Sequence, residues 1–138
     1  MRVHGLALLR GAATGEALAA DVPLSFWGGF DPETGAIIDM RHPLAGEIAA
    51  GRVLVLPAGR GSCSGSGVLL EAIRNGTAPA AIVTSRVDAI IALGAILGDE
   101  LYARGPVTIV IPENERRAIG TGDLVAIDEE GWLRVSPR

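Results

Sequence analysis

The chain has 138 residues, enough for one domain, and its 49% apolar, 4% aromatic and 20% charged residues are typical of a globular protein. All twelve basic residues are arginine, which excludes a P-loop lysine, a Schiff-base lysine and a lysine general base. Sixteen acidic residues give a net charge of −4 without a basic cluster, and we therefore expect no nucleic-acid partner.

The predicted elements are short, because 19 glycines and 8 prolines interrupt the chain. Aliphatic and β-branched runs predict strands at Val3–Leu9, Glu16–Leu18, Ala36–Asp39, Val53–Leu56, Ala80–Val83, Val107–Ile111, Asp123–Ile127 and Trp132–Val135. The Gly11–Gly15 turn is predicted to pair the first two strands, and the last two are predicted to form a hairpin. Pro23–Phe30 is expected to be an aromatic, glycine-rich loop, followed by a turn at Asp31–Gly35.

Two helices are predicted in the middle of the chain. Helical spacing indicates one over Val68–Arg74, ended by Asn75-Gly76, and another from Ser85 to about Leu97, ended by Gly98. The strand–helix alternation predicts a parallel sheet with crossover helices, and the two ends of the chain predict a small antiparallel or barrel-like layer. The expected fold class is α/β: a single β/β/α domain over residues 1–138, with a mixed sheet and about two main helices.

The single cysteine, Cys63, cannot form an internal disulfide, a thiolate zinc site or an iron–sulfur cluster, so we expect no metal bound by this chain. A reduced, cytoplasmic location is the default for such a chain. The N-terminal residues lack the features of a signal peptide, and the longest apolar stretch, Ala89–Leu97, is too short to cross a bilayer. We therefore expect no membrane partner.

The segment most typical of a binding site is Ala58–Gly67, which we call the glycine loop. It joins a predicted strand to a predicted helix, and four of its ten residues are glycine and three are serine. Ligands of open α/β sheets bind at such strand ends, and the N–H groups of a helix N-terminus stabilise an anion. Arg60 adds a charge suited to a carboxylate, and nearby donors would favour the alkoxide of Ser62. The alternative is a tight strand-to-helix turn made of small residues.

The glycine loop does not match the common nucleotide motifs. Ser64 stands where a dinucleotide fingerprint needs its third glycine, and Walker A needs a lysine. Cys63 is a weaker candidate as a reactive thiol. His42 is a candidate to position a substrate, with a packing histidine as the alternative. No base–nucleophile pair or metal set is complete in the sequence, which argues for a subunit that shares its site with a partner.

Several ordered motifs resemble the small, swivelling-domain subunit of the aconitase X family. The resembling stretches are Leu24-Ser25-Phe26-Trp27-Gly28-Gly29, His42-Pro43-Leu44 with Gly46, Gly59-Arg60-Gly61-Ser62-Cys63-Ser64-Gly65-Ser66, Ala78-Pro79-Ala80-Ala81-Ile82-Val83 and Gly94-Ala95-Ile96. The resemblance implies the aconitase swivel fold and a hydro-lyase built from two parts. The large part is expected to carry an iron–sulfur cluster and most substrate contacts, while the small part closes over it and supplies a serine base.

The resemblance also implies roles for particular residues. In other aconitases the serine base follows a Gly-x-Gly, and Ser62 matches that position, with Ser64 as the second candidate. Those enzymes continue with Ser-Arg, where the arginine binds a substrate carboxylate, whereas this chain continues with Cys63-Ser64. We expect Arg60 to take over part of that contact. The expected substrate-binding residues are Arg60, Gly61, Cys63, Ser64 and His42.

The family includes two dehydratase activities, one on cis-3-hydroxy-L-proline, mainly in bacteria, and one on mevalonate 5-phosphate in archaea. The composition, rich in alanine and arginine and free of lysine, is typical of a high-GC bacterium and favours the hydroxyproline substrate. Two other classes stay open: a non-catalytic module that binds an anion in the glycine loop, and a scaffold protein with Phe26–Phe30 at its interface. A phosphohistidine swivel domain is disfavoured, since the glycine loop contains no histidine.

Overall fold

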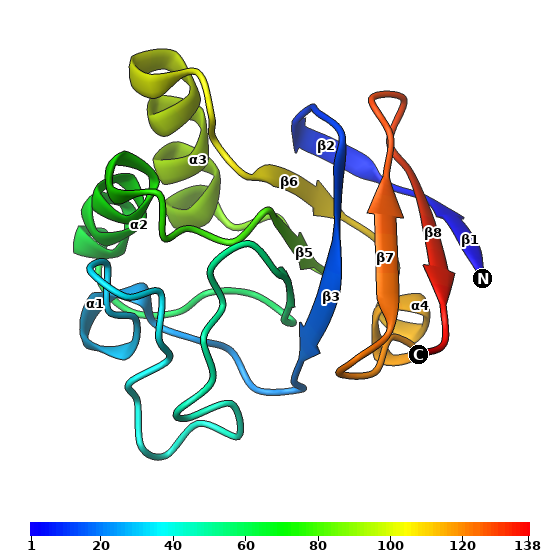
Figure 1. Ribbon diagram of the computed structural model, residues 1–138, viewed down its shortest axis with the longest axis horizontal. Coiled ribbons are helices and arrows are strands. Elements are labelled where there is room, and N and C mark those ends of the chain that lie inside the picture. The colour runs from blue at the N-terminus through cyan, green and yellow to red at the C-terminus, as the bar shows by residue number, and fades with distance from the viewer.

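A computed structural model describes residues 1–138 and consists of eight strands and four helices (Figure 1). The strands are β1 (Arg2–His4), β2 (Leu6–Leu9), β3 (Ala13–Ala19), β4 (Val53–Val55), β5 (Ala81–Thr84), β6 (Val107–Val110), β7 (Leu124–Ile127) and β8 (Trp132–Ser136). The helices are α1 (Phe26–Gly29), α2 (Ser64–Asn75), α3 (Ala89–Tyr102) and α4 (Glu113–Arg117). None of the helices has the length and apolar composition that crossing a membrane requires.

All eight strands belong to one mixed sheet in the order β1-β8-β7-β3-β4-β5-β6-β2. Strands β3 to β6 run parallel, and the other neighbours are antiparallel. The edge strands β1 and β2 are consecutive in the chain with only Gly5 between them, so the two edges approach each other and the sheet nearly closes into a barrel. A Cβ at Gly5 would lie 2.7 Å from Cγ1 of Ile109, and glycine is therefore needed where the chain crosses β6.

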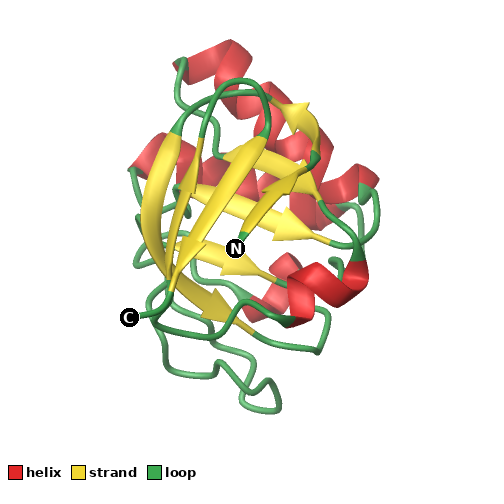
Figure 2. Ribbon diagram, turned by 90° about the vertical axis from the view of Figure 1, so that its right-hand side faces the viewer, coloured by secondary structure: helices red, strands yellow, loops and turns green.

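The N-terminal strands differ from the sequence-based prediction. The single strand predicted over Val3–Leu9 is divided at Gly5, and its predicted pairing with Glu16–Leu18 is wrong. Strand β3 instead pairs antiparallel with β7 over residues 13–16 and parallel with β4 over residues 17–19. It thereby connects the antiparallel half of the sheet to the parallel half, which cross each other in Figure 2. The predicted C-terminal hairpin of β7 and β8 is confirmed.

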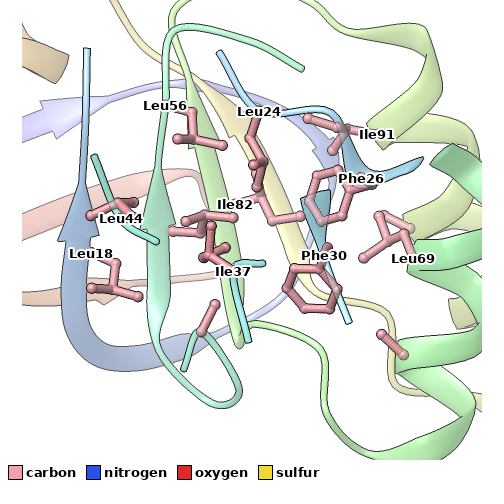
Figure 3. Packing of buried hydrophobic residues seen from close by; sticks show 14 of the residues in the cluster. Leu18, Leu24, Phe26, Phe30, Ile37, Leu44, Leu56, Leu69, Ile82 and Ile91 are labelled. Carbon is pink, nitrogen blue, oxygen red and sulfur yellow. The ribbon is translucent and has the colours of Figure 1, made fainter. Parts of the chain in front are cut away.

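Alternating side chains of the parallel strands supply two separate hydrophobic layers. Val53 and Val55 of β4 belong to the cluster enclosed between the two halves of the sheet. Leu54, in the same strand, belongs to the cluster between the sheet and helices α2 and α3, which lie on one side of the parallel strands (Figure 1). In Figure 3 this second cluster also includes Phe26 and Phe30 from the loop that follows β3. The predicted β/β/α class is confirmed by these layers.

The middle elements agree with the prediction in kind and differ in their bounds. Helix α2 begins four residues earlier than predicted and ends at Gly76 as expected, with φ of 78° at this glycine. Helix α3 begins after Asp88 rather than at Ser85, and it continues through Gly98 to Tyr102. Gly98 does not end the helix, because it is buried where α3 packs on Ile73 of α2, and an added Cβ would overlap that side chain.

Four shorter segments lie outside the main strands and the two long helices. The predicted loop at Pro23–Phe30 contains the short helix α1, and the predicted strand at Ala36–Asp39 forms only isolated bridges. The turn at Asp31–Gly35 is confirmed by its hydrogen bonds and by a φ of 81° at Gly35. Helix α4 was not predicted, although Pro112 followed by acidic residues and then two arginines is a typical helix start and end.

Candidate active site

The glycine loop lies between the carboxyl end of β4 and the start of α2, where sequence analysis expected it. Residues 60 to 64 are all exposed, whereas Gly65 and Ser66, in the first turn of α2, are buried. The structure therefore brings Arg60, Gly61, Ser62, Cys63 and Ser64 together on one exposed segment at the N-terminal end of a twelve-residue helix.

The beginning of the glycine loop is attached to neighbouring segments. The N–H of Gly59 donates to Oδ2 of Asp88 at 2.9 Å, and Arg60 N–H donates to the carbonyl of Leu24 at 3.2 Å. Gly61 has a φ of 92°, and a Cβ there would lie 2.7 Å from Oγ of Ser25. These contacts explain why two glycines stand in this part of the loop, since a side chain at either position would displace a neighbour.

Ser62 has the geometry expected of a polarised hydroxyl at a helix start. Its Oγ accepts the N–H of Ser64 at 3.1 Å, and its carbonyl oxygen accepts the N–H of Gly65 at 2.9 Å. Cys63 occupies the formal N-cap position but makes no side-chain capping bond, so the Ser62 hydroxyl satisfies one of the free N–H groups instead. A backbone donor and the positive end of the helix dipole both stabilise negative charge on this oxygen.

The other serines of the loop differ in their availability. Ser66 is buried and donates from Oγ to the carbonyl of Ile90 at 2.7 Å, so it joins α2 to α3. The Ser64 side chain is exposed and makes no hydrogen bond within the chain. Ser62 and Ser64 are therefore the two hydroxyls accessible to a ligand, and only Ser62 also accepts a backbone N–H.

Arg60 forms an ion pair with Asp39, with 3.6 Å between its Nη2 and Oδ2 of the carboxylate. The arginine side chain is 60% exposed, and a pair of this kind contributes little to stability. The guanidinium therefore remains able to bind a second carboxylate next to the glycine loop. In the sequence Asp39 stands only at the end of a predicted strand, and its pairing with Arg60 was not predicted because the two residues are far apart in the chain.

His42 does not lie free at the site. Its ring is buried, Nδ1 accepts the N–H of Leu44 at 3.1 Å, and Nε2 lies 3.0 Å from the carbonyl of Val22. Because Nδ1 is an acceptor, Nε2 carries the proton and donates to Val22, and both ring nitrogens are engaged. This geometry favours the packing role that sequence analysis held open and leaves no ring nitrogen for a substrate in this conformation.

The structure groups no set of side chains suited to a metal ion. The chain's one thiol, Cys63, is exposed, and no three histidine, cysteine, aspartate or glutamate side chains are grouped to hold an ion. The two cavities, of about 280 and 200 Å³, are lined by residues such as Trp132 and Arg116. The glycine loop lines neither cavity, so its accessible groups lie on an open surface.

A nearly closed mixed sheet with two helices on one side and an exposed glycine- and serine-rich loop at their N-terminal ends defines a swivel-type β/β/α domain. The model of the aconitase X swivel domain matches residues 2–135, and the chain belongs to this family. A holo-form structure of aconitase X from Thermococcus kodakaraensis is 33% identical, with a TM-score of 0.88 over 98% of both chains. The resemblance expected from the sequence is thus confirmed.

The curated relatives carry two different names. The cis-3-hydroxy-L-proline dehydratase of Pseudomonas aeruginosa is 55% identical over 97 residues, which are 70% of this chain and 17% of that protein. The enzyme of the same name from Hypocrea jecorina is 40% identical over 90% of this chain and 21% of its own length. The phosphomevalonate dehydratase small subunit of Archaeoglobus fulgidus is 42% identical over 130 residues, 94% of each chain. The chain thus spans about a fifth of the hydroxyproline dehydratases that it matches.

Proposed function

We propose that the chain is the small subunit of a heteromeric hydro-lyase that dehydrates cis-3-hydroxy-L-proline to pyrroline-2-carboxylate. The observation that carries this proposal is the exposed Ser62 hydroxyl, whose oxygen accepts a backbone N–H at the start of α2. The family to which the chain belongs and the dehydratase names of the chain's relatives support the reaction class. The 55% identity to the Pseudomonas aeruginosa protein supports the substrate.

The proposed partner is a large aconitase X subunit that carries the iron–sulfur cluster and covers the glycine loop. Two observations support a partner: the loop lies on an open surface outside both cavities, and relatives are either named small subunits or are much longer chains. We expect the isolated chain to be inactive, because it holds one base and few substrate contacts. We expect a cytoplasmic location, where an exposed thiol such as Cys63 stays reduced.

In the proposed reaction Ser62 acts as the base. Its Oγ, as the alkoxide, takes the proton from the carbon next to the substrate carboxylate, and the electron pair of that C–H bond forms a carbon–carbon double bond. The hydroxyl group on the neighbouring carbon leaves as hydroxide and takes the proton now held by Ser62, which forms water and restores the alkoxide. The resulting enamine tautomerises to the imine form of pyrroline-2-carboxylate. The Ser64 N–H and the positive end of α2 stabilise the alkoxide before the proton is transferred.

The remaining residues of the loop are proposed to hold the substrate. Arg60 would bind the carboxylate in exchange for its exposed contact with Asp39, and the exposed backbone of Gly61 and Cys63 would stabilise negative charge that develops on it. Ser64 would donate its free hydroxyl to the same group. His42 was also expected to bind the substrate, but it is proposed to act only by shaping the loop on which Leu44 lies.

Mevalonate 5-phosphate is the second candidate substrate. It is supported by the small subunit of Archaeoglobus fulgidus, which aligns over 94% of both chains. The same loop would then face a substrate with both a carboxylate and a phosphate. Assaying the complex with both compounds decides between them, since only mevalonate 5-phosphate carries a phosphate that the site would have to bind.

The test of the base is a comparison of two single variants in the complex with the large subunit. We expect Ser62→Ala to lower kcat by about 10²- to 10⁴-fold, the usual cost of losing a positioned base. Ser64→Ala is the matched control, and its kcat is expected to stay within about tenfold of wild type. Near-normal turnover by Ser62→Ala in an intact complex would refute the assignment. Ligand binding by the isolated chain without turnover in the complex would instead favour an anion-binding module.

A further inference from the structure

Asp88 takes part in two structural elements at once. Its Oδ1 accepts the N–H of Ile91 at 2.9 Å, which is the N-cap hydrogen bond of α3. Its Oδ2 accepts the N–H of Gly59 at 2.9 Å, and Gly59 stands 29 residues away at the beginning of the glycine loop. Capping a helix needs only one of the two oxygens, so the second bond is not explained by the stability of α3.

The surroundings of Gly59 are fitted to this contact. A Cβ at Gly59 would lie 2.9 Å from Oδ2 of Asp88 and 3.1 Å from Cδ1 of Ile91. Only glycine therefore allows the backbone to approach the carboxylate this closely. A hydrogen bond from an N–H to a charged carboxylate is stronger than one between neutral groups, which makes it a firm attachment for an otherwise exposed segment.

This attachment lies three residues before Ser62. The later part of the loop is held by α2 through the carbonyl of Ser62, but on its early side the next backbone bond, from Arg60 to Leu24, is longer at 3.2 Å. A base must lie within hydrogen-bond reach of the proton that it removes, and a displacement of about 1 Å costs on the order of 100-fold in rate. We infer that Asp88 is a positioning residue, which holds the glycine loop in the geometry that Ser62 needs; this inference rests on the proposed function.

The variant Asp88→Ser separates positioning from capping. Serine is as good an N-cap as aspartate, so the Ile91 bond and the stability of α3 are expected to remain, with the melting temperature within about 4 °C of wild type. Its single short hydroxyl does not reach Gly59 at the same time. Asp88→Asn is the second variant, because its one acceptor oxygen serves Ile91 while its amide N–H group faces the Gly59 N–H.

The experiment measures the loop and the reaction separately. In the isolated chain we expect Asp88→Ser to speed hydrogen exchange of the Gly59 amide at least tenfold and to change the rate at which iodoacetamide alkylates Cys63. In the complex with the large subunit we expect kcat to fall about 10- to 100-fold, with KM within about threefold. Asp123→Ser is the matched control, because it removes a similar bond to the Gly120 N–H in a distant turn. The kcat of Asp123→Ser is expected to stay within about twofold of the wild-type value.

The inference is overturned if Gly59 exchange and kcat of both Asp88 variants stay within twofold of wild type, or if KM rises while kcat is unchanged. The failure of the proposed function looks different, since it would appear as normal turnover by Ser62→Ala. If Ser62→Ala is inactive while both Asp88 variants are unchanged, the proposed base stands and the positioning role falls. Because the exchange and alkylation rates need no substrate, they test the attachment of the loop in either case.

Discussion

Gly61 shows how the candidate site constrains a single residue. It combines a φ of 92° with a close approach to Ser25, so a side chain would be strained by its backbone and blocked by its neighbour. We expect Gly61→Ala to lower the free energy of unfolding by about 1–2 kcal/mol, measured by urea denaturation. Gly67→Ala is the control, because a Cβ there meets nothing within 4 Å on the exposed side of α2. It is expected to stabilise the chain by about 0.5–1 kcal/mol, and equal effects of both variants would contradict the argument.

Arg116 is a second residue whose surroundings predict a measurable effect. It is buried and donates to Glu113 at 2.9 Å, and it also forms an ion pair with Asp21 at 3.0 Å. The hydrogen bond from Arg116 holds the pKa of the Glu113 carboxyl below its ordinary value of 4.5. A carboxyl with a lowered pKa in the folded state stabilises the fold above its unfolded pKa, and this contribution is lost as the pH falls through the folded value.

We therefore expect Glu113→Gln to be less stable than wild type at pH 7. We also expect it to lose less stability between about pH 5 and pH 3, the range in which carboxyl groups take up protons. Chemical denaturation across this pH range measures both effects. Glu115→Gln, on the same helix at a residue without an ion pair, is the control and should follow the wild-type curve. Parallel curves for wild type and Glu113→Gln would show that the Arg116 contact does not contribute.

At the scale of elements, α2 and α3 pack closely because two glycines of α3 face α2. A Cβ at Gly94 would lie 3.0 Å from the Ser66 carbonyl oxygen, and one at Gly98 would overlap Ile73. We expect Gly98→Ala to destabilise the chain by about 1–3 kcal/mol, although alanine is the better helix former by about 1 kcal/mol. Thermal or urea unfolding measures the change.

The cause of this loss is tested by a second substitution. Ile73→Val removes the methyl group that an alanine at position 98 would meet, so the double variant is expected to recover part of the loss. Additive losses in the double variant would mean that the two side chains do not interact. If Gly98→Ala stabilises the chain, the close packing of α2 and α3 does not depend on this glycine.

At the scale of the molecule, three exposed apolar residues stand in segments that contact the glycine loop. Trp27 is 60% exposed and follows the buried Phe26 near Gly65, Met40 is 86% exposed beside Asp39, and Val87 is 62% exposed beside Asp88. Apolar and aromatic groups gathered next to a site are typical of surfaces covered by another protein. We expect the large subunit of the proposed complex to cover this surface.

Trp27 reports on this contact. In a Trp132→Phe background, Trp27 emission is expected to shift to shorter wavelength when the large subunit is added, because the indole leaves water. Trp27→Phe is the control, because it retains only Trp132 of β8, which packs against Arg2 and His4 of β1. Strand β8 lies far from α1 in Figure 1, and the emission of Trp132 should not change. We also expect Trp27→Ala to weaken the complex by about tenfold. Unchanged Trp27 emission in a complex that forms would place the contact elsewhere.

Features that depend on neighbouring residues in the chain were predictable from the sequence. Asn75-Gly76 ends α2 as predicted, because Gly76 adopts the left-handed conformation in which a helix commonly ends. The β7–β8 hairpin and the strand-to-helix position of the glycine loop were predicted for the same reason, from turn residues and alternating apolar runs. The family motifs also lie in such continuous segments, and the family was identified from them.

Other features were decided only by the tertiary structure. The alternation in Ala13–Ala19 indicates a strand, but it does not say that β3 pairs with β7 and β4. In the sequence Gly98 is typical of a helix end, but in the structure it lies inside α3 and makes room for Ile73 of α2. Likewise, the second oxygen of Asp88 meets Gly59 only because β4 and β5 are adjacent in the sheet. A residue's type determines which bonds it is able to form, whereas the packing of distant segments determines which partner it meets.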